Sequence, residues 1–117
     1  MPRGAFKLMW KTLKNEQEFF AFVINATKQN DYYWVFAHIT PIYDDNKKAI
    51  GYYSVRRVMP ESLKPTISEL YEKALETEKG LNEKQATEAS YDFLVKFLKD
   101  NDLNYNDFIC DLYRQHA

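Results

Sequence analysis

The stretch from Asn30 to Val58, NDYYWVFAHITPIYDDNKKAIGYYSVRRV, decides the fold. Two runs rich in aromatic and β-branched residues, 31–40 and 49–58, flank the polar cluster YDDNKK. A third run of this kind, EFFAFVINATK at 18–28, precedes them. Such runs, separated by short Asn- and Asp-containing turns, predict three antiparallel strands joined as a meander.

The two turns of this meander lack glycine, the residue that takes positive φ at the lowest cost. Asparagine tolerates that conformation better than most other residues. We therefore expect Asn30 and Asn46 to take positive φ in the two turns.

Strand alternation sorts the side chains of the second and third runs into two faces. One face carries Tyr33, Val35, Ala37, Ile39, Tyr52, Ser54 and Arg56. The opposite face carries Trp34, Phe36, His38, Tyr53 and Val55. Because both faces include apolar residues, we expect the sheet to be covered on both sides, by the C-terminal helices or by another chain.

The remaining segments have helical periodicity. Helical spacing of Phe6, Met9, Trp10 and Leu13 predicts a short amphipathic helix over about 4–14. Prolines 60 and 65 mark a change of composition, after which we predict a helix over 66–79, ended by Gly80 as a C-cap with Leu81. Asn82 and Gln85 resemble a capping box that opens a second helix, and a third begins near Asn104. The predicted fold class is α+β: a short helix, a three-stranded antiparallel sheet and C-terminal helices.

Composition limits the classes of function. The chain has 117 residues, a net charge of −1 and one cysteine, Cys110. This charge gives no electrostatic footprint for nucleic acid or an anionic membrane, although the pair Arg56 and Arg57 lies beside aromatic residues. A single cysteine excludes an internal disulfide and is typical of a reducing compartment. The segment MPRGAFKLMWKTLK lacks the apolar core of a signal peptide, and no run approaches the about 20 apolar residues of a membrane helix. We therefore expect a cytoplasmic protein.

Catalytic constellations are missing from the sequence. His38 is expected on a strand without a matching serine, cysteine or second histidine, and His116 is nearly terminal. Cys110 lies in the apolar pattern FICDL and is expected to be a packed residue rather than a nucleophile. Asp44 and Asp45 fit a solvated turn better than a metal site. The sequence therefore predicts that the protein is not an enzyme and binds no metal.

The sequence resembles the C-terminal half of a PAS sensory domain of the bacterial aerotaxis-receptor and chemotaxis type. The resemblance rests on the upstream pattern M-P-x-x-x-F-x-x-x-W and on Lys28, Asp31, Tyr33, Trp34, Val35, Ala37, Pro41, Gly51, Tyr52, Ser54, Arg56 and Arg57. The family usually has His-Pro-Asp before Met-Pro, so the resemblance implies an N-terminally truncated domain. It also implies that 1–58 are the C-terminal half of a PAS-like domain and that 59–117 are a helical extension on or beside the sheet.

The resemblance further implies a non-enzymatic sensory module for chemotaxis or energy taxis, acting by ligand- or redox-dependent protein–protein interaction. Its partner would be a receptor signalling domain or a second copy in a homodimer, with no nucleic acid and no direct membrane insertion. The resemblance leaves the cofactor of this chain unknown: FAD is the candidate that intact relatives suggest, and the half of the domain that would grip a flavin is missing here. By resemblance, the ligand-facing residues are Asn25, Tyr33, Val35, Ala37, Ile39, Tyr52, Ser54 and Arg56, and the interaction face is Trp34, Phe36, His38, Tyr53 and Val55.

Two alternatives to this interpretation follow from the residues. The ligand-facing set has the apolar alternation of an ordinary core, which the C-terminal helices would cover. The chain would then be a truncated PAS-derived interaction domain without a small-molecule ligand. The opposite set could be covered by a helix of the same chain, for which 66–79 is the candidate.

Overall fold

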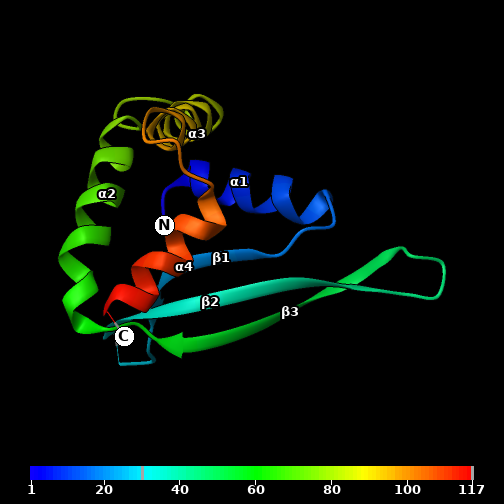
Figure 1. The fold of residues 1–117 in the computed structure, drawn as a ribbon. Helices are drawn as coiled ribbons and strands as arrows, with labels where there is room; N and C mark the ends of the chain where they lie inside the picture. Colours follow the sequence, from blue (N-terminus) through cyan, green and yellow to red (C-terminus); the bar gives the residue numbers. More distant parts are fainter. Residues whose placement is uncertain (30, 117) are drawn as a thin grey trace.

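A computed structural model describes residues 1–29 and 31–116 of the chain. Its elements follow the chain in the order helix, three strands, helices (Figure 1). Their bounds are α1 Arg3–Lys14, β1 Phe19–Ala26, β2 Tyr32–Tyr43, β3 Ala49–Val58, the 3₁₀ turn η1 Glu61–Leu63, α2 Lys64–Glu76, α3 Glu83–Asp100 and α4 Tyr105–His116. The predicted α+β fold class is confirmed.

The three strands form one antiparallel sheet in the order β1-β2-β3. The register pairs Phe22 with Phe36 and Phe36 with Arg57, which fixes the side chains that share a face. A register shift at Ile42 and Tyr43 marks an irregularity where β2 approaches its turn into β3. The predicted meander is therefore confirmed, with β1 and β3 as its two edges.

Asp44 organises the turn between β2 and β3. Its carboxylate accepts hydrogen bonds of 2.9 Å from the backbone N–H groups of Asn46 and of Lys48. The residue with positive φ is Lys47, at 62°. The prediction for Asn46 is wrong because the type of turn, not the residue's own preference, decides which position takes this conformation. The prediction for Asn30 lies outside the described residues.

Helix α1 lies against α3 through its smallest side chains. Gly4 and Ala5 are buried there, and a Cβ built on Gly4 would lie 2.1 Å from the Tyr91 backbone nitrogen. The predicted helix over about 4–14 is confirmed, but Phe6 and Trp10 of its apolar pattern are 45% and 44% exposed. The stripe rotates because α3 requires close approach, which only small residues allow.

The start of α3 lies where the sequence predicts it, but α2 ends earlier than predicted. Asn82 accepts a 2.8 Å hydrogen bond from the backbone N–H of Gln85, which confirms it as the N-cap of α3. Gly80 has a φ of +76°, but α2 already ends at Glu76. The residues between them therefore form a turn, and Gly80 does not cap the helix directly.

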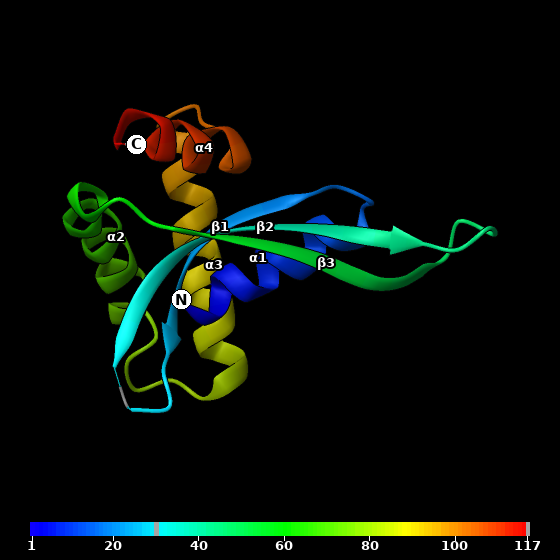
Figure 2. The same cartoon turned by 90° about the horizontal axis from the view of Figure 1, so that it is seen from below.

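Helices cover β1 and β2 on both faces of the sheet. We call the side that carries Ala21 and Ala37 the α1 face, because Leu13 of α1 packs there with Phe19 and Ala21. We call the side that carries Phe22 and Phe36 the α4 face. Figure 2 shows α1 and α4 on opposite sides of the strands.

The main core lies on the α4 face. Its buried residues are Phe22, Phe36, Met59, Leu63, Ile67, Tyr71 and Ile109. Within it, the Tyr71 hydroxyl donates a 2.6 Å hydrogen bond to the Phe22 carbonyl oxygen, which ties α2 to β1. Helix α2 therefore supplies the same-chain cover that the alternative interpretation expected on this face, and α4 adds to it.

Strand β3 differs from the rest of the sheet. All of its residues are exposed except Gly51, which is partly buried. The expectation that both faces of the whole sheet are covered is wrong for β3, because the helices gather over β1 and β2 (Figure 1). Among the described residues, helices with the length and apolar character to cross a membrane are not found.

Candidate functional site

The register places the predicted ligand-facing residues together on the α1 face. Val35 and Ala37 are nearly inaccessible, at 4% and 1% exposure, and Ile39 is partly buried against α1. Tyr33, Tyr52, Ser54 and Arg56 are exposed instead, and Asn25 is partly buried. Helix α1 packs on this face, and Tyr105 of α4 joins it by stacking on Phe19 with ring centroids 4.7 Å apart, while α2 and the rest of α4 pack on the opposite face. The alternative that the C-terminal helices cover this face is therefore met only at Tyr105.

Polar contacts bridge the exposed part of the α1 face. The Arg56 guanidinium donates a 3.0 Å hydrogen bond from Nη1 to the Asn25 side-chain oxygen. Since β2 lies between the strands of these two residues, the Arg56 side chain crosses β2 to reach β1. Trp10 of α1 meets Tyr52 edge to face, with ring centroids 5.3 Å apart. These contacts occupy the surface that a planar ligand would need.

The α1-face residues do not fit a flavin in this arrangement. Helix α1 lies directly on the centre of the face, and the Asn25 amide oxygen already accepts from Arg56. Tyr33 and Tyr52 are 48% and 42% exposed, so the described residues do not enclose a ring there. Ligand pockets usually bury most of their ligand's surface, which this open face does not do.

The α4 face divides its predicted interaction residues into two groups. Trp34 packs on Tyr71 of α2, with ring centroids 5.8 Å apart, and Phe36 stacks on Tyr113 of α4 at 4.3 Å. His38, Tyr53 and Val55 lie beyond the helices, with Tyr53 61% exposed and Val55 38% exposed. The helices therefore cover only one end of this face.

An open groove lies on the uncovered end, which we call the aromatic groove. Its floor is lined by Phe20, Phe36, His38, Val55 and Arg57, around a hollow of about 290 Å³. A neighbouring hollow of about 460 Å³ shares three of these residues and continues past Glu18 to α4, where it is lined by Asn106, Asp107, Cys110, Tyr113 and Arg114. The two hollows together run from the free strand β3 to the C-terminal helix.

Stacked rings give the groove a rigid apolar floor. Phe20 stacks on His38 with ring centroids 4.2 Å apart and on Phe36 at 5.7 Å. Asn106 fixes α4 beside this stack, because its side chain accepts from the Phe20 N–H at 3.1 Å and donates to the Glu18 carbonyl oxygen at 2.8 Å. Side chains held in this way lose little conformational entropy when a partner binds.

The charges at the groove are mixed. His38 pairs with the Glu18 carboxylate at 2.8 Å between Nε2 and Oε2, and Arg114 pairs with Asp111 on its own helix. Arg57 forms no ion pair within the described part of the chain. Burial raises the pKa of the Cys110 thiol, so this side chain is protonated at neutral pH and suits packing rather than nucleophilic chemistry.

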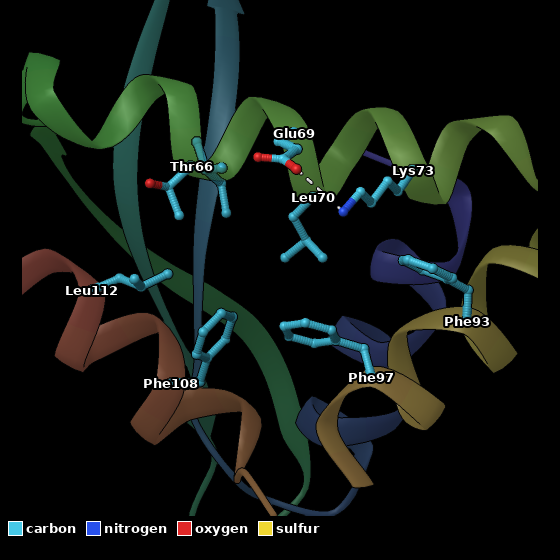
Figure 3. A pocket seen from close by; sticks show the side chains of 9 residues that line it. Thr66, Glu69, Leu70, Lys73, Phe93, Phe97, Phe108 and Leu112 are labelled. Carbon is cyan, nitrogen blue, oxygen red and sulfur yellow. Dashed lines mark ion pairs between the residues drawn. The ribbon is translucent and has the colours of Figure 1, made fainter. Parts of the chain in front are cut away.

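A third hollow, of about 390 Å³, lies among the three C-terminal helices (Figure 3). Leu70, Phe93, Phe97 and Phe108 point into it, and the Glu69–Lys73 ion pair, at 3.2 Å, lies at its edge. Sequence reasoning missed this hollow, because these residues read as ordinary helix-core positions. Periodicity shows which residues face inward but not whether three helices meet closely.

Metal-binding clusters and unpaired buried polar atoms do not mark any of these sites in the described part of the chain. Across residues 1–29 and 31–116, groups of three or more acidic, histidine or cysteine side chains placed to hold a metal are not found. Every buried side-chain nitrogen or oxygen in that part of the chain has a hydrogen-bond partner. The aromatic groove is therefore the best candidate functional site, since it combines an apolar floor with an arginine that forms no ion pair.

Comparison with known proteins gives one informative similarity. Fifty-six residues of the chain are 41% identical to a stretch of the aerotaxis receptor of Escherichia coli (strain K12). The match covers 48% of this chain and 11% of the receptor, so the chain spans about a tenth of the length of this curated relative. No family model matches the chain. The relative is a receptor by name, in agreement with the predicted sensory role at this coarse level.

Proposed function

We propose that this protein is a non-enzymatic signal-transduction module of bacterial chemotaxis or energy taxis, with a PAS-derived sheet as its working part. The similarity to an aerotaxis receptor carries this proposal. The α+β fold is compatible with a partial PAS domain, since a helix and three antiparallel strands precede the helical segment. The module acts in the cytoplasm by contact with another protein.

The aromatic groove is the contact surface in this proposal. An apolar side chain of the partner would pack on Phe20, Phe36 and Tyr113, whose rings already form a rigid stack. A carboxylate beside that side chain would pair with Arg57. The partner is therefore an acidic and apolar segment of a receptor signalling domain. Aromatic and arginine side chains are the groups that most often dominate such interfaces.

A small-molecule ligand is a separate part of the proposal. The geometry of the α1 face favours the alternative without a ligand, because α1 and the Arg56–Asn25 contact already occupy that face. The test is to purify the chain from cells, record its absorbance in the flavin region and measure its melting temperature with added FAD. We expect a colourless protein with an unchanged melting temperature. A bound flavin, or a rise of several degrees in the melting temperature with FAD, would instead support a sensor that acts through a cofactor.

The test of the contact is binding of the labelled chain to the purified aerotaxis receptor of E. coli, measured by fluorescence anisotropy. We expect saturable binding, and we expect Arg57→Glu to weaken it roughly tenfold or more, since it reverses a charge at the interface. Lys96→Glu is the matched control, because Lys96 is an exposed residue of α3 outside the groove, and it should leave binding unchanged.

A test in cells examines the role itself. Expression of the chain in motile E. coli K12 should reduce band formation in an oxygen gradient, because the free module competes for receptor contacts. Arg57→Glu should restore the band, and Lys96→Glu should not. Undisturbed aerotaxis together with no binding to the receptor would overturn the proposed function.

A further inference from the structure

Strand β3 presents a complete free edge. It pairs with β2 on one side, and none of its residues is buried. In Figure 1 the helices lie on the side of β1 and β2, and the outer edge of β3 faces away from them. Ile50, Tyr53 and Val58 are 65%, 61% and 81% exposed, so the strand also offers apolar side chains. Natural proteins usually protect such an edge, because it accepts another strand.

The hydrogen-bond pattern fixes which residues of β3 offer their backbone groups outward. The Met59 N–H donates to the Trp34 carbonyl oxygen at 3.4 Å, and these residues lie opposite each other in the continued register. In an antiparallel ladder, hydrogen-bonded residues alternate with residues whose N–H and C=O point away. The outward-pointing residues of the regular part of β3 are therefore Val58, Arg56, Ser54 and Tyr52, whereas Ile50 lies at the register shift, where this alternation is interrupted.

We propose that two copies of this chain associate through β3, antiparallel and centred on Ser54, to form one continuous sheet with the order β1-β2-β3-β3-β2-β1. An antiparallel partner strand must place its own outward-pointing residues opposite these, which permits only registers that shift by two residues at a time. A second copy of β3 meets this requirement, because it carries the same alternation of outward-pointing residues. The proposal does not depend on the sensory role.

Side-chain complementarity selects the register centred on Ser54. It places Tyr53 opposite Val55 of the second copy, which is an aromatic and β-branched pair of the kind that stabilises sheets. It also places Tyr52 beside the stem and guanidinium of Arg56 of the second copy. The regular part of the strand from Gly51 to Arg57 is paired in this register.

Neighbouring registers are less favourable. Centring on Tyr53 places Val58 opposite Lys48, which lies outside the strand. Centring on Val55 places Tyr53 opposite Arg57 of the second copy, which separates Tyr53 from Val55. Centring on Arg56 brings two guanidinium groups face to face. A net charge of −1 per copy adds little repulsion in any register.

The helices permit this association. The two-fold axis would pass through the sheet at Ser54, so each copy keeps α1 on one face and α2 and α4 on the other, over β1 and β2. Because β3 is exposed apart from the contact of Trp10 with Tyr52, the second β3 can pair with its outer edge without meeting a helix backbone. The aromatic groove borders β3 and stays open at its α4 end.

Sedimentation of the full chain between about 1 and 300 µM tests the proposal, with the expectation of a monomer–dimer equilibrium. Ser54→Pro should abolish the dimer, because it removes an outward N–H while the bonds to β2 remain. Ser54→Ala is the control and should still dimerise. A chain that stays monomeric to 300 µM, or that forms only undefined aggregates, overturns the proposal.

Charge and cross-linking variants test the register itself. Tyr53→Lys and Val55→Glu should each weaken the dimer about tenfold, and the double variant should restore it, because only this register sets those positions opposite each other. In a Cys110→Ala background, Ser54→Cys should oxidise to a covalent dimer, since facing strand residues lie within disulfide reach. Tyr53→Cys should form no such disulfide, because position 53 lies opposite Val55 of the second copy, two residues away from position 53 of that copy. Equal cross-linking of both variants contradicts the register.

Discussion

The backbone N–H of Gly4 donates a 2.7 Å hydrogen bond to the hydroxyl oxygen of Ser90, and both residues are buried where α1 crosses α3. The Ser90 hydroxyl in turn donates to the Ala86 carbonyl oxygen of its own helix at 3.1 Å. One serine thus satisfies an N–H of the first turn of α1, which has no partner inside its own helix. This contact joins α1 to α3.

Gly4→Ala should destabilise the protein by about 1–3 kcal/mol, because the added methyl group would overlap the backbone of α3 and force the helices apart. Urea denaturation measures this change. Gly51→Ala is the matched control, since a Cβ there meets nothing within 4 Å. Equal stability of the two variants would contradict the close crossing of α1 and α3.

Tyr71→Phe should lower the free energy of unfolding at neutral pH by about 1–3 kcal/mol, because the buried Phe22 carbonyl oxygen loses its donor. Tyr32→Phe, at a residue 73% exposed, should change nothing. Urea denaturation of both variants at pH 7 makes the comparison.

Ionisation of Tyr71 should lower the stability of the protein in alkali. Burial raises the pKa of Tyr71 above its usual value of 10.0, so the unfolded chain ionises first as the pH rises. The contribution of Tyr71 is therefore complete below pH 10 and is lost above it, at about 1.4 kcal/mol per pH unit. Tyr71→Phe should make the decline shallower between pH 10 and 11.5. An identical pH profile for both proteins would contradict the buried hydroxyl.

Lys47→Gly should stabilise the protein by about 1 kcal/mol, because Lys47 holds a positive φ that costs little only for glycine. Thermal unfolding followed by circular dichroism should show a higher melting temperature. Lys48→Gly, one residue further along the same turn, should give no gain, since the positive φ belongs to its neighbour. A gain from both variants would point to a general effect of turn flexibility.

The fragment 59–117 should not fold alone. Ile67, Tyr71 and Ile109 of its helices are buried against Phe22 and Phe36 of the sheet, and Ala86 and Leu94 of α3 are buried beneath the other elements. Without these contacts, helices of this length are marginal in water. Circular dichroism of the fragment should show low helicity and no cooperative melting. A cooperative transition in the isolated fragment would show that its helices form an independent core.

The sheet could be predicted because its signals are local. Alternation along 31–40 and 49–58 assigns each side chain to a face, and the register keeps those sets together. Asn82 could also be recognised as a cap, since the capping contact spans only three residues.

Features that depend on distant segments could not be predicted. Phe6 and Trp10 lie outside the buried stripe of α1 because the partner of that helix is Ser90, which is far away in the sequence. Periodicity does not say which neighbour a helix meets. The aromatic groove likewise exists only because Asn106 holds α4 beside β1. The positive φ of Lys47 follows from the type of turn, to which its own preference contributes little.

The crossing of Gly4 with Ser90 has a consequence for synthesis on the ribosome. The partners of α1 and β1, Ser90 and Asn106, are translated long after the strands themselves. At 5–20 residues per second, roughly 4–16 s pass between the synthesis of β1 and that of Asn106. During that interval the nascent chain carries Phe19, Phe20 and Phe22 without their final cover. The growing polypeptide is therefore a natural client for chaperones that bind at the exit tunnel.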